Sequence, residues 1–376
     1  MKIKSIKLYE LGIPFRYSIN HTLKSRRKSQ SIIIEIETLD GTYHYGEGAP
    51  REYVINEPMA SIKSAFSEVV PQLNIENLDS IASILSLSHT ICDKYKVSSL
   101  ATAIECAMLD ILSKKTQKSI ESLIHNDDVK HKLCPYSGIL TFRDRKEFIE
   151  TLELVKKLSL PQVKLKVGND HDIDNIKLVR EVLGKNIDLR LDANRAWTME
   201  QALNSIPEFY EYDISSIEEP LLPSEVAKLS QLSKDIDIPI MLDESIYNMQ
   251  QAVQYSDTID PSKLKFNLKL SKFGGPLRAS EVFQYAHARG IMCSLGCSVG
   301  ESAILSSMGR IFAQAHELSY LEGSYSRFFM ERDISLHDIT FSKGGISKRI
   351  TELGLGTEIK REIMQVYSQE ICSYDK

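Results

Sequence analysis

Polar side chains recur in this chain at an almost constant interval, long enough for one strand and one helix. Lys166, Asp192, Glu218, Asp243 and Lys269 are separated by 26, 26, 25 and 26 residues, and each closes a short apolar or alternating run. A steady period of this length indicates a structural repeat. One strand, one helix and two short loops fill it, which is the βα module of a parallel barrel.

The same interval extends the repeat in both directions. Two further steps of 26 lead from Lys269 to Leu295 and Leu321, and residues Cys134 to Ile139 supply a first strand. Eight parallel strands predict an α/β fold, a closed (β/α)8-type barrel. A doubly wound open sheet is the structural alternative, but it binds its ligand at one switch point and would not place charged residues at five successive strand ends.

Composition sets the broad class of the protein. The chain has 376 residues, 42% hydrophobic, with 46 basic against 51 acidic residues. It can therefore form two domains, or one large domain with an appendage. The acidic balance argues against a nucleic-acid partner. No apolar run reaches the roughly 18 residues of a membrane span, and the alternating N-terminus lacks the apolar stretch of a signal peptide. We expect a cytoplasmic protein with no membrane partner and six free cysteines.

The strand-end residues predict a metal centre, because the C-terminal ends of all barrel strands meet at one mouth. Asp192, Glu218 and Asp243 would converge there and repel one another unless a cation lies among them. Hard oxygen ligands suit Mg²⁺, which also keeps positions open for a substrate oxygen. For any one of the three, the alternative is an acid that caps the following helix.

The lysines suggest proton transfer. Mg²⁺ on a substrate carboxylate with a lysine base is the combination used to remove an α-proton and form an ene-diolate. Such a base needs a pKa lowered toward neutrality, and Lys164, two residues from Lys166 on the same strand face, is a cation that favours this shift. Lys166 and Lys269 on opposite walls predict a racemase or epimerase. A syn elimination, with one lysine as base and the other as electrostatic support, remains the alternative.

With these residues assembled, the sequence resembles the muconate-lactonising subgroup of the enolase superfamily, and within it the dipeptide epimerases. The motifs that carry the resemblance are "KLK" (164–166), "LDANRAW" (191–197), "IEEP" (217–220), "LDES" (242–245) and "NLKLSKFGG" (267–275). The resemblance implies a modified (β/α)7β barrel with an α+β capping domain. It assigns Asp192, Glu218 and Asp243 as Mg²⁺ ligands, Lys166 and Lys269 as the acid/base pair, and Lys164 as a contact to the substrate carboxylate.

The resemblance also implies a domain division. Residues 1–128 would form the capping domain, 129–325 the catalytic barrel, and 326–376 a segment that returns to the cap. A loop near residues 16 to 28 would cover the mouth, where Asn20, Lys24 or Arg26 would meet the distal side chain of the substrate. A homo-oligomer is a possible assembly.

Substrate specificity is expected to depend on the eighth strand. Dipeptide epimerases of the Ala-Glu type carry Asp-x-Asp there, which holds the peptide ammonium, whereas this chain has Glu322 and Ser324. Glu322 still offers one carboxylate to an ammonium. Ser137 on the first strand and Cys297 after the seventh are further expected substrate contacts. The predicted reaction is inversion of the C-terminal α-carbon of an L-Ala-L-Xaa-type dipeptide.

Two other functions compete with this prediction. Within the same enzyme frame, o-succinylbenzoate synthesis or a muconate cycloisomerase reaction would use the same lysines and metal. A catalytically silent barrel kept as a binding protein is the alternative outside enzymes. Loss of a ligand or base would signal it, and none is lost in this sequence.

Overall fold

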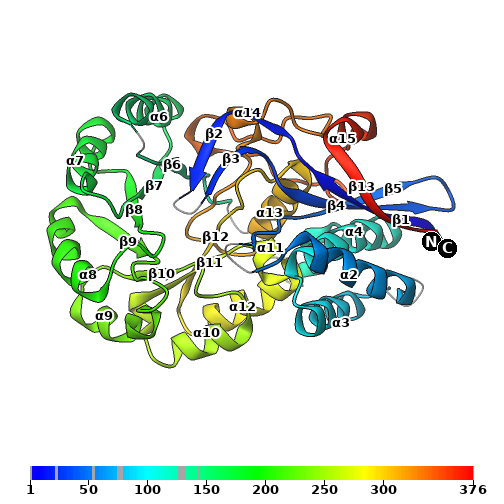
Figure 1. Ribbon diagram of the computed structural model, residues 1–376, viewed down its shortest axis with the longest axis horizontal. Coiled ribbons are helices and arrows are strands. Elements are labelled where there is room, and N and C mark those ends of the chain that lie inside the picture. The colour runs from blue at the N-terminus through cyan, green and yellow to red at the C-terminus, as the bar shows by residue number, and fades with distance from the viewer. Residues whose placement is uncertain are drawn as a thin grey trace.

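Two regions, a capping domain and a barrel, form the molecule shown as a computed structural model in Figure 1. The structure describes residues 2–21, 24–52, 56–73, 79–125, 133–142 and 144–375, without the side chains of residues 19–21, 24 and 25. In Figure 1 the strands of the cap lie to one side of the barrel, and the two chain termini lie side by side at the outer edge of the cap. The predicted boundary between residues 128 and 129 lies outside the described residues.

The cap is an antiparallel sheet backed by helices. Its strand order is β13-β1-β4-β5, with β1 at Ile3–Leu11, β4 at Ser31–Thr38, β5 at Tyr43–Gly48 and β13 at Ser368–Asp375. The helices are α2 (Met59–Val69), α3 (Ile81–Thr90), α4 (Ser98–Thr116) and α5 (Ile120–Ile124). Helix α4 is buried from Ser99 through Ser113, with Glu105 and Asp110 among its buried side chains.

The predicted loop near residues 16 to 28 forms a hairpin instead. Strands β2 (Pro14–His21) and β3 (Lys24–Lys28) pair with each other as a separate two-stranded sheet. The register shifts between Pro14 and Ile19. Arg26 is buried within this hairpin, at 6% exposure.

The barrel consists of parallel strands in chain order, β6 through β12. They are β6 (Gly138–Leu140), β7 (Gln162–Lys166), β8 (Asp188–Asp192), β9 (Ile214–Glu218), β10 (Ile240–Leu242), β11 (Leu264–Leu268) and β12 (Met292–Leu295). The helices on its outside are α6 (Arg145–Leu158), α7 (Asp172–Leu183), α8 (Met199–Ser205), α9 (Leu229–Asp235), α10 (Met249–Ser256), α12 (Pro276–Ala288) and α13 (Ala303–Ala315), with the short α11 (Leu270–Phe273) after β11. This confirms the predicted α/β barrel with an α+β cap.

The eighth position of the barrel is a single residue rather than a strand. Leu321 forms parallel bridges both to Leu295 at the end of β12 and to Tyr136 just before β6. The amide of Ser137 donates to the Leu321 carbonyl at 2.8 Å, and the amide of Glu322 donates to the Leu295 carbonyl at 2.8 Å. The barrel therefore closes at the predicted residue, Leu321, through single-residue bridges to its two neighbours.

Buried glutamates of the cap bind the N-termini of barrel helices. Glu47 on β5 accepts from the amides of Ser302 and Leu305, both at 3.0 Å, at the start of α13. Glu105 on α4 accepts from the amide of Leu277 at 2.6 Å, at the start of α12. A carboxyl oxygen at a helix N-terminus accepts from amides that have no partner within the helix. These contacts fix the cap against the barrel.

The last segment of the chain pairs with the first strand of the cap. It contains α14 (Ser326–Phe329), α15 (Arg361–Tyr367) and β13, which pairs antiparallel with β1. Arg361 donates to both carboxylate oxygens of the buried Glu35, each at 2.9 Å. All six cysteines are free. Within the described ranges, none of the helices combines the length and apolar character that a membrane crossing requires.

Candidate active site

The five periodic residues lie at the C-terminal ends of five successive strands. Lys166, Asp192 and Glu218 end β7, β8 and β9, while Asp243 and Lys269 directly follow β10 and β11. In the strand register, Lys166 pairs with Asp192 and Asp192 with Glu218. Neighbouring strands are about 4.8 Å apart, so these side chains share one end of the barrel.

Each carboxylate of this group contacts a lysine. The Lys166 ammonium lies 3.4 Å from Asp192 Oδ2, and the Lys164 ammonium lies 3.3 Å from Glu218 Oε2. Lys269 forms a short ion pair with Asp243. The three acids are buried, at 2%, 1% and 2% exposure for Asp192, Glu218 and Asp243. Burial of charge is costly unless it is paired, and the lysines supply the pairing.

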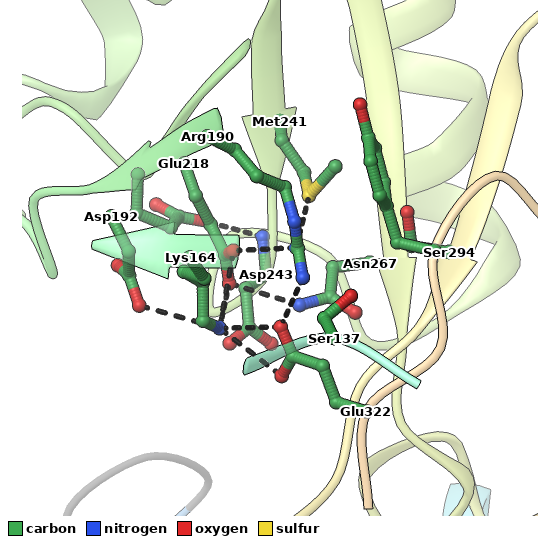
Figure 2. A network of polar contacts seen from close by, with 12 residues as sticks. Ser137, Lys164, Arg190, Asp192, Glu218, Met241, Asp243, Asn267, Ser294 and Glu322 are labelled. Carbon is green, nitrogen blue, oxygen red and sulfur yellow. Dashed lines mark hydrogen bonds and ion pairs between the residues drawn. The ribbon is translucent and has the colours of Figure 1, made fainter. Parts of the chain in front are cut away.

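Glu322, from the eighth barrel position, joins this network through two cations (Figure 2). Its Oε1 lies 2.6 Å from Arg190 Nη2 and 3.0 Å from Lys164 Nζ. Arg190 on β8 is 1% exposed and stacks on the Tyr320 ring at 4.4 Å. Figure 2 shows Arg190 between Met241, Glu218 and Glu322, with Lys164 reaching from the other side.

The local charges shift the pKa values of these groups in opposite directions. Burial alone would raise the pKa of Asp192, but Lys166 and Lys164 outweigh it and hold the pKa near 2. Burial and the facing Asp192 and Asp243 carboxylates raise the pKa of Glu218, although Lys164 acts against them. Burial would lower the pKa of Lys269, but the Asp243 carboxylate holds it above its ordinary value.

Three residues that support the strand-end acids were not predicted. Lys272, one helical turn after Lys269, donates to Asp243 Oδ1 at 2.7 Å. Glu219 accepts from the amides of Asp243 and Ser245, at 2.8 and 2.6 Å. Arg190 Nη1 lies 3.6 Å from Glu218 Oε2. The sequence held a signal for Arg190, because it precedes Asp192 by two positions as Lys164 precedes Lys166, and such residues share a strand face.

A cavity of about 600 Å³ opens at this end of the barrel. That volume lies within the usual range for small-molecule sites. Its lining includes Lys164, Lys166, Lys269 and Lys272, the acids Asp192, Asp243 and Glu322, and the cap residues Tyr17, Arg26 and Arg51. Four aromatic residues that follow the eighth barrel position also line it, Tyr325, Phe328, Phe329 and Phe341. The site thus combines charged groups at the strand ends with an apolar wall.

The predicted specificity residues fall in different places. Cys297 and Glu322 line the cavity. Ser324 is outside that lining and hydrogen-bonds to the Tyr136 hydroxyl at 3.0 Å. Ser137 is also outside it, fully buried, and donates to Gln162 Oε1 at 3.3 Å. The side chain of Lys24 lies outside the described part of the chain.

The three strand-end acids fit a divalent cation by chemistry and placement. They are buried oxygen donors on neighbouring strands, and Asp192 and Asp243 both raise the pKa of Glu218, a repulsion that a cation would relieve. Among the described residues, no three His, Cys, Asp or Glu side chains are already gathered tightly enough to hold an ion together. Each of the three acids instead contacts a lysine, so binding would require these side chains to turn from the ammonium groups toward the ion.

Two profiles of known protein families match this chain. The family profile "Enolase C-terminal domain-like" matches residues 147–363. The profile "Mandelate racemase / muconate lactonizing enzyme, N-terminal domain" matches residues 5–125. The chain therefore belongs to the mandelate racemase and muconate-lactonising enzyme family of the enolase superfamily. The resemblance read from the five motifs is confirmed at the level of the family.

Individual relatives cover nearly the whole chain. A hydrophobic dipeptide epimerase of Enterococcus faecalis is 29% identical, over 94% of this chain and 98% of its own length. An N-succinyl-L-Arg/Lys racemase of Bacillus cereus is 28% identical, over 97% of each chain. The crystal structure of the E. faecalis dipeptide epimerase with Mg and the dipeptide L-Leu-L-Tyr has a TM-score of 0.84 at 25% identity, and covers 95% of this chain and 100% of that one. The structure of the B. cereus racemase has a TM-score of 0.85 at 26% identity, and covers 100% and 99%.

These likenesses confirm the coarser expectation, an enolase-superfamily isomerase that works by 1,1-proton transfer. The identities of 29% and 28% belong to relatives with two different substrate classes. The substrate of this chain is therefore a matter for the proposal that follows.

Proposed function

We propose that this protein is a Mg²⁺-dependent epimerase that inverts the α-carbon of the C-terminal residue in a dipeptide of the L-Ala-L-Xaa type. The observation that carries the proposal is the placement of the two lysines. Lys166 ends the second strand of the barrel and Lys269 follows the sixth. In a ring of eight positions, the second and sixth face each other, so an α-carbon held between them has an amine on either side.

The chain's own residues divide the work in this proposal. One lysine, as the free amine, takes the α-proton, and the opposite lysine, as the ammonium, returns a proton to the other face. Lys164 contacts the substrate carboxylate, where negative charge develops as the proton leaves. Asp192, Glu218 and Asp243 would hold Mg²⁺, which would supply positive charge at that carboxylate. The three acids would then no longer pair with the lysines, so the lysines would no longer be held as ammonium ions by these contacts.

The aromatic wall supports an apolar side chain on the inverted residue. Tyr325, Phe328, Phe329 and Phe341 line the same cavity as the lysines. Burial of a hydrophobic side chain against such a surface contributes about 1.5–3 kcal/mol. The dipeptide relatives support the same choice, since one is named for hydrophobic dipeptides.

A second candidate is racemisation of an N-succinylated amino acid. It is favoured by Arg26, a buried cation in the cavity lining that would suit a distal carboxylate, and by the B. cereus relative. Both candidates share a carboxylate, an α-hydrogen and an acylated nitrogen. They differ only in the group at the acyl end.

Solvent deuterium exchange at the α-carbon tests the proposal. We expect the enzyme with Mg²⁺ to exchange the α-hydrogen of both L-Ala-L-Phe and L-Ala-D-Phe in D₂O, detected by mass spectrometry. Lys166→Ala should abolish exchange from one diastereomer and Lys269→Ala from the other, because each amine serves one face. Loss of both exchanges in each variant would instead indicate a one-base reaction in which the second lysine gives electrostatic support.

A further inference from the structure

The carboxylate of Glu322 is already neutralised by two cations of the protein. Arg190 Nη2 lies 2.6 Å from Oε1. The Lys164 ammonium lies 3.0 Å from Oε1 and 3.2 Å from Oε2. Glu322 is 5% exposed and Arg190 is 1% exposed, so water contributes little to the balance. Both oxygens of Glu322 are therefore engaged before a substrate enters.

The buried Lys164 ammonium relies on Glu322 to balance its charge. Its ammonium also lies 3.5 Å from Asp192 Oδ2 and 3.3 Å from Glu218 Oε2. Those two acids belong to the set proposed to hold the metal ion. Once they serve that role, Glu322 is the remaining carboxylate among the three that the structure places against Lys164. A buried ammonium without such a partner is strongly disfavoured.

Arg190 completes this support from the neighbouring strand. Its side chain contacts Met241 Sδ at 3.8 Å and stacks on the Tyr320 ring. It pairs with Lys164 in the strand register, so the two cations lie on neighbouring strands and hold Glu322 between them, as Figure 2 shows. A free substrate ammonium at Glu322 would be a third cation on one carboxylate, next to two like charges.

Building on the proposed function, we infer that Glu322 and Arg190 are positioning residues that hold Lys164 toward the substrate carboxylate, and that Glu322 is not the subsite for a substrate ammonium. The site therefore selects acylated amino acids without requiring a charged amine at the acyl end. This separates the chain from the Asp-x-Asp arrangement, in which the eighth strand holds the peptide ammonium.

A pair of substrates that differ only in the ammonium tests this directly. L-Ala-L-Phe and N-propionyl-L-Phe have the same skeleton, with hydrogen in place of the amine. We expect kcat/KM for α-hydrogen exchange by the wild-type enzyme with Mg²⁺ to agree within about fivefold, the range of a solvated ion pair. A loss of about 100-fold or more for the propionyl compound, the usual consequence of deleting a buried charge partner, would overturn the inference.

The Glu322→Gln variant tests whether Glu322 positions Lys164. It should lower kcat/KM for both substrates by the same factor, mainly through a higher KM, because Lys164 loses its support in both cases. A fall confined to L-Ala-L-Phe would show that Glu322 binds the ammonium, and no change with either would remove its positioning role. Glu317→Gln, which deletes an exposed carboxylate five residues earlier, is the matched control and should leave both constants unchanged.

The measurements distinguish a failure of the proposed function from a failure of this inference alone. If the wild-type enzyme neither exchanges nor binds either compound in calorimetric titration, the proposed function fails and the inference fails with it. If Glu322→Gln does not fold, because Arg190 is left buried beside a neutral amide, the wild-type ratio of the two substrates still decides the inference alone.

Discussion

At the scale of single residues, the site is organised by side chains that never reach the reacting atoms. Glu219 is 1% exposed and adopts a left-handed φ of 42°. This conformation turns it away from the neighbouring Glu218 and toward the loop after β10. There it accepts from the Asp243 and Ser245 amides and from the Ser245 hydroxyl at 2.7 Å. Glu219 thus fixes the backbone of one proposed metal ligand.

Removal of Glu219 should weaken both the fold and the metal site. Glu219→Ala leaves two buried amides without acceptors, and we expect the free energy of unfolding to fall by about 2–5 kcal/mol in urea titrations. Mg²⁺ affinity, measured by calorimetry, should fall with it because Asp243 is no longer held. Glu208→Ala, an exposed control, should change neither quantity. Unchanged Mg²⁺ binding in a folded Glu219→Ala variant would contradict the positioning role.

At the scale of elements, the close approach of a strand to a helix sets the geometry of the cap. A Cβ at Gly46 on β5 would lie 1.8 Å from the Ala103 carbonyl oxygen on α4. Both elements are buried at this point, so neither can move aside cheaply. We expect Gly46→Ala to lower the free energy of unfolding by more than about 3 kcal/mol.

A second glycine provides the comparison for that measurement. A Cβ at Gly309 in α13 meets only Leu295 Cδ2, at 3.4 Å. Gly309→Ala should therefore be neutral or stabilise the protein by up to about 1 kcal/mol, because alanine is the better helix former. Equal effects of the two substitutions in thermal or urea unfolding would refute the role assigned to the β5–α4 contact.

The strands and the residues at their ends also show which features of the fold and site can be predicted from the sequence. Lys166, Asp192, Glu218, Asp243 and Lys269 were predictable because a parallel barrel puts every strand end at one mouth, whatever the loops do. The contacts of Glu219 with the loop after β10 were not, since they depend on one φ angle. The eighth strand was predictable in position, at Leu321, but not in its length. The contact of Ser324 with Tyr136, away from the cavity lining, accompanies a φ of 53° that no pattern in the sequence reveals.

At the scale of the whole molecule, cap and barrel share buried polar contacts and one continuous apolar core. The core runs from Ile6 and Leu8 in the cap through Leu109 in α4 to Leu165 and Phe266 in the barrel. Glu47 and Glu105 cross the same boundary to the starts of α13 and α12. We therefore expect the two domains to unfold together, in a single calorimetric transition. Two resolved transitions in the wild-type protein would contradict this coupling.

A buried carboxyl group at the boundary between the domains, that of Glu105, should also titrate. Burial raises the pKa of Glu105 from 4.5 to about 8, although Ser88 and the Leu277 amide act against it. The folded state then holds this proton more tightly than the unfolded state, so the contribution of Glu105 to stability falls as pH rises from about 4.5 to 8 and is constant outside that window. Glu105→Gln keeps an acceptor for the Leu277 amide and does not titrate. The difference in free energy of unfolding between wild type and Glu105→Gln, measured by urea titration at intervals across this range, should therefore move steadily in favour of the variant. Other buried acids titrate in both proteins and cancel in the difference, so a flat curve would mean that Glu105 ionises in the folded protein as freely as in the unfolded chain.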